Sequence, residues 1–150
     1  PLHSLASNWR SSTALNGTPG GSDAETFLGD PMADADGDGL NALLEYALGS
    51  TAGDAGPSPE ARATLGTGTF DDGNGGTTEF LTFSYRRNLG ADDILYQVQL
   101  SSDLDNWADT GSEYVTSVSN EDGTETVTIR SVTPIADLPK KFIRLKINLP

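Results

Sequence analysis

The sequence predicts a mainly β protein: a small antiparallel β-sandwich with an N-terminal helical segment that carries a calcium-binding loop. Three observations lead to this prediction. The 150 residues include 17 Gly, 8 Pro and only 35% hydrophobic residues, a composition typical of a chain with many turns. From residue 63 onward, short segments alternate apolar and polar side chains between turn-forming residues. An acidic motif of loop type begins at Asp34 and runs into an apolar pattern of helical period.

The N-terminal part is expected to hold two short helices separated by a loop. Apolar residues recur at helical spacing within residues 3–14, which predicts an amphipathic helix. Residues 16–31 are rich in Gly, Ser, Asn and Pro and predict a loop. A second helix is predicted over residues 40–48, where leucines form one apolar stripe, and Gly49 is well suited to end it.

The remainder of the chain predicts strands joined by turns. Alternation of apolar and polar residues places the strands at residues 63–70, 79–87, 94–101, 114–119, 125–132 and 141–148. The short connection at residues 88–93 predicts that the second and third strands form a hairpin. The chain thus divides into a helical segment with the calcium loop, a linker and a β-sandwich, or forms one compact domain. These parts span residues 1–50, 51–62 and 63–150.

The acidic motif fits the calcium-binding pattern D-x-D-x-D-G-x5-E at every defining position. Calcium takes about six to eight oxygen ligands in a flexible geometry. The aspartates at positions 1, 3 and 5 can supply carboxylates, position 7 a backbone carbonyl, and the glutamate at position 12 both of its oxygens. The glycine at position 6 permits the sharp turn that the loop requires. The predicted ligands are Asp34, Asp36, Asp38, Leu40 and Glu45.

A plain acidic turn before a helix is the alternative interpretation of this motif. Gly29 and Pro31 interrupt the chain just upstream, so no entering helix of the EF-hand type is expected. The loop is therefore predicted to act as a structural clamp rather than as a paired sensor. A second acidic turn, at residues 71–76, lacks the ordered ligand spacing and is expected to be only a turn.

Charge and composition exclude several classes of partner and suggest a location. The net charge of -13 would repel phosphate backbones, so neither nucleic acid nor an anionic membrane surface is expected. No apolar stretch has transmembrane length, so no membrane insertion is expected. A weak single loop would fill at millimolar extracellular calcium but not in the cytosol. The chain is accordingly expected to lie outside the cell, as part of a larger secreted protein.

Catalysis finds little support in the sequence, and the protein is predicted not to be an enzyme. The single histidine, His3, has no cysteine and no serine elbow to work with, and it cannot hold zinc alone. A pair of carboxylates for glycoside hydrolysis remains open, because such residues can come from distant strands. Most carboxylates here, however, fall in turns or in the acidic motif.

Binding to a glycan is better supported. Flat aromatic side chains flanked by hydrogen-bonding groups can stack on sugar rings. For the tryptophans the alternative is a packing role, at the end of the sandwich or on a helix. For the arginine the alternative is an ion pair with Asp92 or Asp93. The candidate ligand-binding residues are Trp107, Tyr85, Tyr114, Trp9 and Arg86.

Several segments, in this order, resemble the C-terminal module of large secreted proteins from environmental bacteria. The most specific of them is residues 33–49, ADADGDGLNALLEYALG, whose loop is similar to those of dockerins and thrombospondin type 3 repeats. Residues 61–78 hold more glycine than this resemblance leads us to expect. The other segments are Trp9-Arg10 and residues 81–87, 96–107, 122–128 and 142–145.

The resemblance implies an accessory module on hydrolases, adhesins or autotransporter-like proteins, with calcium as its cofactor and no agreed activity. Together with the aromatic residues, it predicts a non-catalytic extracellular module that holds a polysaccharide or cell-surface glycan for an attached enzyme. The alternative is a terminal module that anchors or sorts its parent protein at the cell surface, or that serves only as a spacer.

Overall fold

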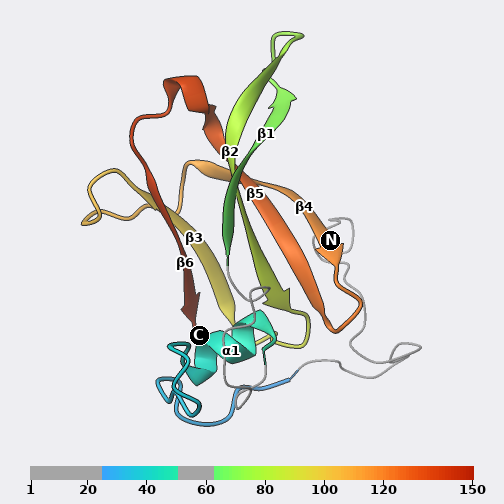
Figure 1. Ribbon diagram of the computed structural model, residues 1–150, viewed down its shortest axis with the longest axis vertical. Coiled ribbons are helices and arrows are strands. Elements are labelled where there is room, and N and C mark those ends of the chain that lie inside the picture. The colour runs from blue at the N-terminus through green and yellow to red at the C-terminus, as the bar shows by residue number, and fades with distance from the viewer. Residues whose placement is uncertain (1–24, 51–62) are drawn as a thin grey trace.

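The computed structural model describes residues 25–50 and 63–150. This part of the chain is mainly β, as predicted, with one α-helix and a short 3-10 helix (Figure 1). The predicted helix at residues 3–14, the linker at 51–62 and Trp9 lie outside the described residues. Within the part that is described, no helix combines the length and the apolar character needed to cross a membrane. The elements are α1 (Ala42–Leu48), β1 (Thr64–Asp71), β2 (Thr77–Asn88), β3 (Leu95–Ser101), β4 (Ser112–Ser119), β5 (Thr124–Pro134), η4 (Ile135–Asp137) and β6 (Phe142–Asn148).

The strands form two antiparallel sheets. The larger has the order β1-β2-β5-β4, and the smaller pairs β3 with β6. Two turns between predicted strands join neighbouring strands of the larger sheet. One, at residues 71–76, connects β1 and β2, and the other, at residues 120–123, connects β4 and β5. The predicted hairpin of the second and third strands is wrong, because β2 pairs with β1 and β5 while β3 pairs with β6. Residues 89–94 instead carry the chain from one sheet to the other, with Leu89 and Ala91 buried.

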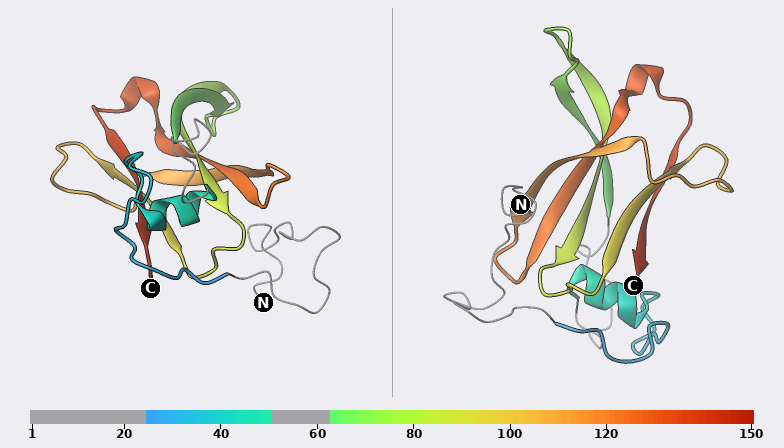
Figure 2. Two further views of the ribbon diagram at one scale, coloured as in Figure 1. Left: turned by 60° about the horizontal axis from the view of Figure 1, so that its bottom comes forward. Right: turned by 180° about the vertical axis from the view of Figure 1, so that it is seen from behind.

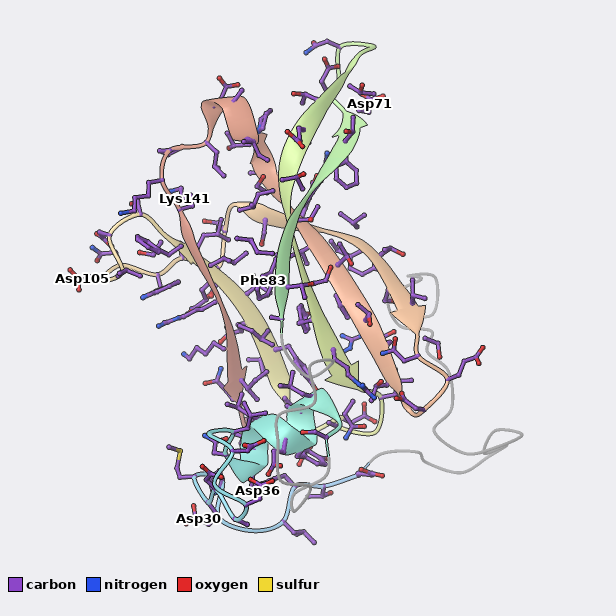
Figure 3. The ribbon with its side chains drawn as sticks, in the orientation of Figure 1. Asp30, Asp36, Asp71, Phe83, Asp105 and Lys141 are labelled. Carbon is purple, nitrogen blue, oxygen red and sulfur yellow. The ribbon has the colours of Figure 1, made fainter. Side chains whose placement is uncertain are left out.

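The hydrophobic core lies between the two sheets, as in the predicted small β-sandwich. One face of β2 and β5 contributes Phe83, Tyr85, Val127 and Ile129, and the register places Phe83 opposite Ile129 (Figure 3 labels Phe83). Four residues of the smaller sheet pack against this cluster, namely Tyr96, Val98, Ile143 and Leu145. In β2, β5, β3 and β6, alternate residues thus face the other sheet, which is the alternation seen in the sequence.

Helix α1 closes one end of the two sheets (Figure 2). Side chains of β2 and β3 donate hydrogen bonds to its last carbonyls. The Asn88 Nδ2 of β2 donates to the Tyr46 carbonyl at 3.0 Å, and the Tyr96 hydroxyl of β3 donates to the Ala47 carbonyl at 2.7 Å. The Tyr46 hydroxyl donates in turn to Asp93 at 3.0 Å. Because these side chains satisfy groups that a helix end leaves unpaired, the helix is fixed in one orientation on the sheets.

The segment before helix α1 is attached to residues 88–94, the crossover that carries the chain from β2 to β3. The backbone amide of Glu25 donates to the Gly90 carbonyl at 2.7 Å, and that of Phe27 donates to the Asp93 carboxylate at 2.7 Å. The Phe27 ring also packs against the Tyr46 ring, with centroids 5.4 Å apart. The described N-terminal segment and residues 88–94 therefore hold each other in place.

Gly49 ends helix α1 as predicted, in a left-handed conformation with a φ of 71°. Its amide donates to the Tyr46 carbonyl and the Ser50 amide to the Glu45 carbonyl, which is a Schellman arrangement. A Cβ at this position would overlap the Thr124 methyl group of β5. The glycine is therefore required both by its conformation and by the close approach of the helix end to the sheet.

Gly49→Ala is expected to lower the free energy of unfolding by about 1 to 3 kcal/mol, since it combines a left-handed alanine with a steric overlap. Thr124→Ser removes only the overlapping methyl group, so the glycine substitution should cost about 1 kcal/mol less in that background. Urea denaturation of the four proteins measures this coupling. An equal cost in both backgrounds would show that the contact with Thr124 does not matter.

Candidate metal centre

The acidic loop is built onto the first turn of helix α1. Asn41 is the N-cap, and its side-chain oxygen accepts from the Leu44 amide at 3.0 Å. The chain upstream folds back onto the same turn, where the Ala42 amide donates to the Ala33 carbonyl at 2.7 Å and the Leu43 amide to the Pro31 carbonyl at 3.3 Å. The loop is thus closed at its base, and no helix enters it among the described residues, as Pro31 predicts.

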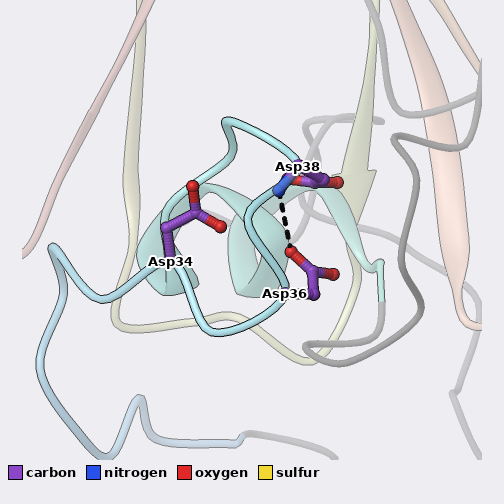
Figure 4. A group of neighbouring side chains, drawn as sticks. All are labelled: Asp34, Asp36 and Asp38. Atoms are coloured by element: carbon purple, nitrogen blue, oxygen red, sulfur yellow. Dashed lines mark hydrogen bonds between the residues drawn. The ribbon is translucent and has the colours of Figure 1, made fainter.

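Three aspartates converge inside this loop (Figure 4). One carboxylate oxygen from each of Asp34, Asp36 and Asp38 lies within 4.8 Å of the others. Their remaining bonds shape the loop: Asp34 accepts from the amides of Gly37 at 2.8 Å and Gly39 at 3.2 Å. Both glycines have positive φ, of 75° and 91°, as the predicted turn at loop position 6 requires for Gly39.

One oxygen of Asp36 and the Glu45 residue are buried in the loop, and neither residue has a positive partner among the described residues. The Asp36 Oδ2 is buried and accepts no hydrogen bond. The Glu45 residue on α1 is only 3% exposed, and burial raises the pKa of its carboxyl, followed by the charges of Asp36, Asp38 and Asp34. No described Lys or Arg forms an ion pair with any of the four acids. A buried carboxylate normally has a cation or a hydrogen-bond donor beside it, so this arrangement needs positive charge.

The residues present fit a hard divalent cation. Three aspartate carboxylates lie together, and their oxygens are ligands that calcium prefers. Glu45, the predicted fourth carboxylate, is not part of this group, although the charges of the three aspartates help to raise the pKa of its carboxyl. The Leu40 amide donates to Asp38 at 2.7 Å, which holds the backbone at the position predicted to offer its carbonyl. In the other acidic turn, Asp72 likewise accepts from two amides, those of Asn74 at 2.8 Å and Gly76 at 3.0 Å, and these bonds lower its pKa. Among the described residues no second group of three metal-ligating side chains is found.

Among the described residues, the candidate glycan-binding aromatics are dispersed over the fold. Tyr85 belongs to the core between the sheets, because alternation along β2 turns it toward the other sheet, and it has no exposed face. Tyr114 is 54% exposed on β4, an edge strand of the larger sheet, whereas Trp107 follows β3 of the smaller sheet. The Trp107 indole donates to the Leu104 carbonyl at 2.9 Å, and the Arg144 guanidinium lies 4.0 Å from its ring centroid.

Arg86 is occupied within the protein. It donates to the Thr124 hydroxyl at 2.9 Å and forms an ion pair with Asp122. The hydrogen bond from the Thr124 hydroxyl, with smaller help from Arg86, lowers the pKa of Asp122. This pair ties the turn at 120–123 to β2. An ion pair was the structural alternative for the arginine, but the partner is Asp122 and not the expected Asp92 or Asp93.

No protein-family model, no curated protein and no solved structure matches this chain. The candidate site is therefore interpreted from its own residues.

Proposed function

We propose that the protein is a non-catalytic, extracellular calcium-binding module in which one Ca²⁺ in the loop of residues 34–45 fastens the helical segment to the β-sheets. The observation that carries the proposal is the convergence of three aspartate carboxylates, one of them with a buried oxygen that accepts no hydrogen bond, without a positive partner among the described residues. A divalent cation would neutralise the repulsion between these carboxylates and would give the buried Asp36 oxygen a partner.

The class of metal follows from the ligand chemistry. The loop offers only oxygen atoms, which suits calcium or magnesium rather than zinc or copper. Magnesium requires a small, near-ideal octahedron, whereas a loop with glutamate at position 12 can close around the larger ion with both oxygens. Extracellular calcium is present at millimolar concentration, so even a weak site would be filled there.

For the wider role, we propose attachment rather than glycan holding. The glycan role depends on several exposed aromatic faces, yet Tyr85 is buried, and Trp107 and Tyr114 belong to different sheets or their connections. Anchoring through a protein contact requires no such platform. Within this proposal the module joins its parent protein to a partner at the cell surface, and calcium keeps the module folded.

Glu45→Gln tests the calcium site because its effect should change sign with the metal. Without calcium the raised pKa of Glu45 means that the native state holds this proton more tightly than the unfolded state does, so ionisation at pH 7 destabilises the fold. The Glu45→Gln substitution should then raise the melting temperature in EDTA. In calcium the same substitution should lower the melting temperature, since a ligand is lost.

Calorimetric titration with CaCl2 supplies the direct measurement, with Asp72→Asn as the matched control from the acidic turn that is not a site. The Asp72→Asn control should bind calcium with the same affinity as the unsubstituted protein. Absence of calcium binding by metal-free protein, or a Glu45→Gln effect of the same sign in both conditions, would contradict the proposal.

A further inference from the structure

A groove runs between the helical segment and strand β6. It has a volume of about 370 Å³ and is lined on one side by residues 144–147 of β6 and on the other by Met32, Asn41, Leu43 and Leu44. The residues of β6 in this list are consecutive. Because neighbouring residues of a strand point to opposite faces, a cavity that touches all of them must lie along the edge of the strand and not over one face.

No other described strand pairs with that edge of β6. Among the described strands β6 pairs only with β3, in an antiparallel register from Leu95 opposite Asn148 to Ser101 opposite Phe142. No described strand therefore uses the backbone groups on its other side. A free edge of this kind can pair with another extended chain, and proteins that do not use it usually block it with a loop, a proline or charge.

Two of the residues that line the groove, Arg144 and Lys146, are basic, in a strongly acidic protein. Four of the nine basic residues of the chain fall within residues 140–146. Three others, Arg86, Arg87 and Arg130, form ion pairs with acids of the larger sheet. By contrast, Arg144 and Lys146 are exposed and form no ion pair with a described residue; Arg144 instead donates to the Gln99 side chain at 2.7 and 2.9 Å.

These two cations lie on the same face of β6. Leu145 packs toward the core, so its neighbours on either side point to the outer face of the smaller sheet. Residues paired across antiparallel strands share a face, and opposite charges there are favourable while like charges are not. A second copy of β6 is thus a poor occupant, because in the register centred on Leu145 the Arg144 of one copy would face the Lys146 of the other.

We propose that this groove binds an extended acidic peptide segment of a partner protein, which adds to the free edge of β6 as a third strand of the smaller sheet. Its acidic side chains, two residues apart, face Arg144 and Lys146. Its apolar side chains alternate with them and enter the groove beside Leu43 and Leu44. Main-chain hydrogen bonds supply affinity, and the alternating side chains supply specificity.

The opposite wall of the groove is part of the helical segment that the proposed calcium site would hold in place. For that wall, the peptide proposal therefore rests on the proposed function. Asn41 donates to the Met32 sulfur at 3.8 Å, and Met32 is 73% exposed at the mouth of the groove. Calcium, by holding residues 31–42 in place, is expected to strengthen peptide binding by several-fold.

The probe is a synthetic peptide of about ten residues in which valine alternates with glutamate, long enough to cover the whole of β6. Titrated into the calcium-loaded protein, it is expected to shift the amide resonances of residues 144–147. The same peptide with alternate amides N-methylated cannot pair with the edge and should not bind. A peptide with lysine in place of glutamate should bind at least about tenfold more weakly.

Lys146→Glu should weaken binding of the glutamate peptide by about tenfold and strengthen that of the lysine peptide. Lys141→Glu makes the same charge change outside the groove and should have little effect on either, which separates local pairing from net charge. The proposal is overturned by failure of the glutamate peptide to bind, by binding that leaves the β6 amides unshifted, or by a dimer of the protein joined through β6.

Calcium titration without peptide keeps the two proposals separate. Calcium binding without peptide binding would overturn the groove alone. Peptide binding to a protein that does not bind calcium would support the groove and overturn the proposed calcium function.

Discussion

Removal of calcium is expected to lower the melting temperature by about 5 to 11 °C. A ligand that binds only the native state adds about 2.7 kcal/mol of stability at a hundredfold excess over its Kd. In a domain of about this size, each kcal/mol corresponds to roughly 2 to 4 °C. Differential scanning calorimetry in CaCl2 and in EDTA measures the difference directly.

Asp36→Ala should abolish this difference, because Asp36 supplies the buried oxygen that has no other partner. Asp72→Ala, in the turn at residues 71–76, should retain it. Hydrogen exchange should locate the effect, with protection lost across residues 30–48 in EDTA and kept in β2 and β5. An unchanged melting temperature in protein shown to be metal-free would refute the calcium site.

Phe83→Ala is expected to be the most damaging single change, lowering the free energy of unfolding by about 3 to 5 kcal/mol. Its ring lies in the core between the sheets and packs against Tyr85, with centroids 6.1 Å apart. Removal leaves a cavity that neighbours on four strands would have to fill. A loss of this size is a large share of the stability of an ordinary domain.

Leu65 provides a matched control for this substitution, since it pairs directly with Phe83 across β1 and β2. It is 61% exposed, because the two-stranded sheet does not cover the edge strand. Leu65→Ala should therefore change the free energy of unfolding by no more than about 0.5 kcal/mol. Urea denaturation of both variants tests the comparison, and equal losses would mean that the core is not centred between the sheets.

The strands and the helix could be predicted because their signals are local. Alternation placed the core residues of β2 and β6 on one face, and the glycine after the apolar stripe marked the end of α1. Strand pairing is not local: the alternating pattern of β3 fits any antiparallel neighbour equally well. The hairpin prediction treated residues 88–93 as a turn, whereas the burial of Leu89 and Ala91 makes them part of the interior.

The acidic cluster could likewise be predicted, because the spacing of Asp34, Asp36 and Asp38 alone brings them together. The burial of Glu45 depends on how α1 packs on the sheets and has no local signal. The fate of the aromatics depends on the same long-range packing, which buries Tyr85 and sets Arg144 over Trp107. The groove went unpredicted, although the concentration of basic residues at 140–146 was a visible signal of it.

Residues 25–27 are bonded to residues 90 and 93, and the acidic loop follows them in the chain. A force applied from the N-terminal side would therefore act on these bonds and on the acidic loop before it acts on the strands. A pull would first break the bonds of Glu25 and Phe27 to residues 90 and 93, and would then reach the acidic loop and α1 before the strands. Opening residues 25–48 would release about 80 Å of extended chain while the sheets stay folded. If the proposed calcium site is correct, the force needed to open this segment should rise with the calcium concentration.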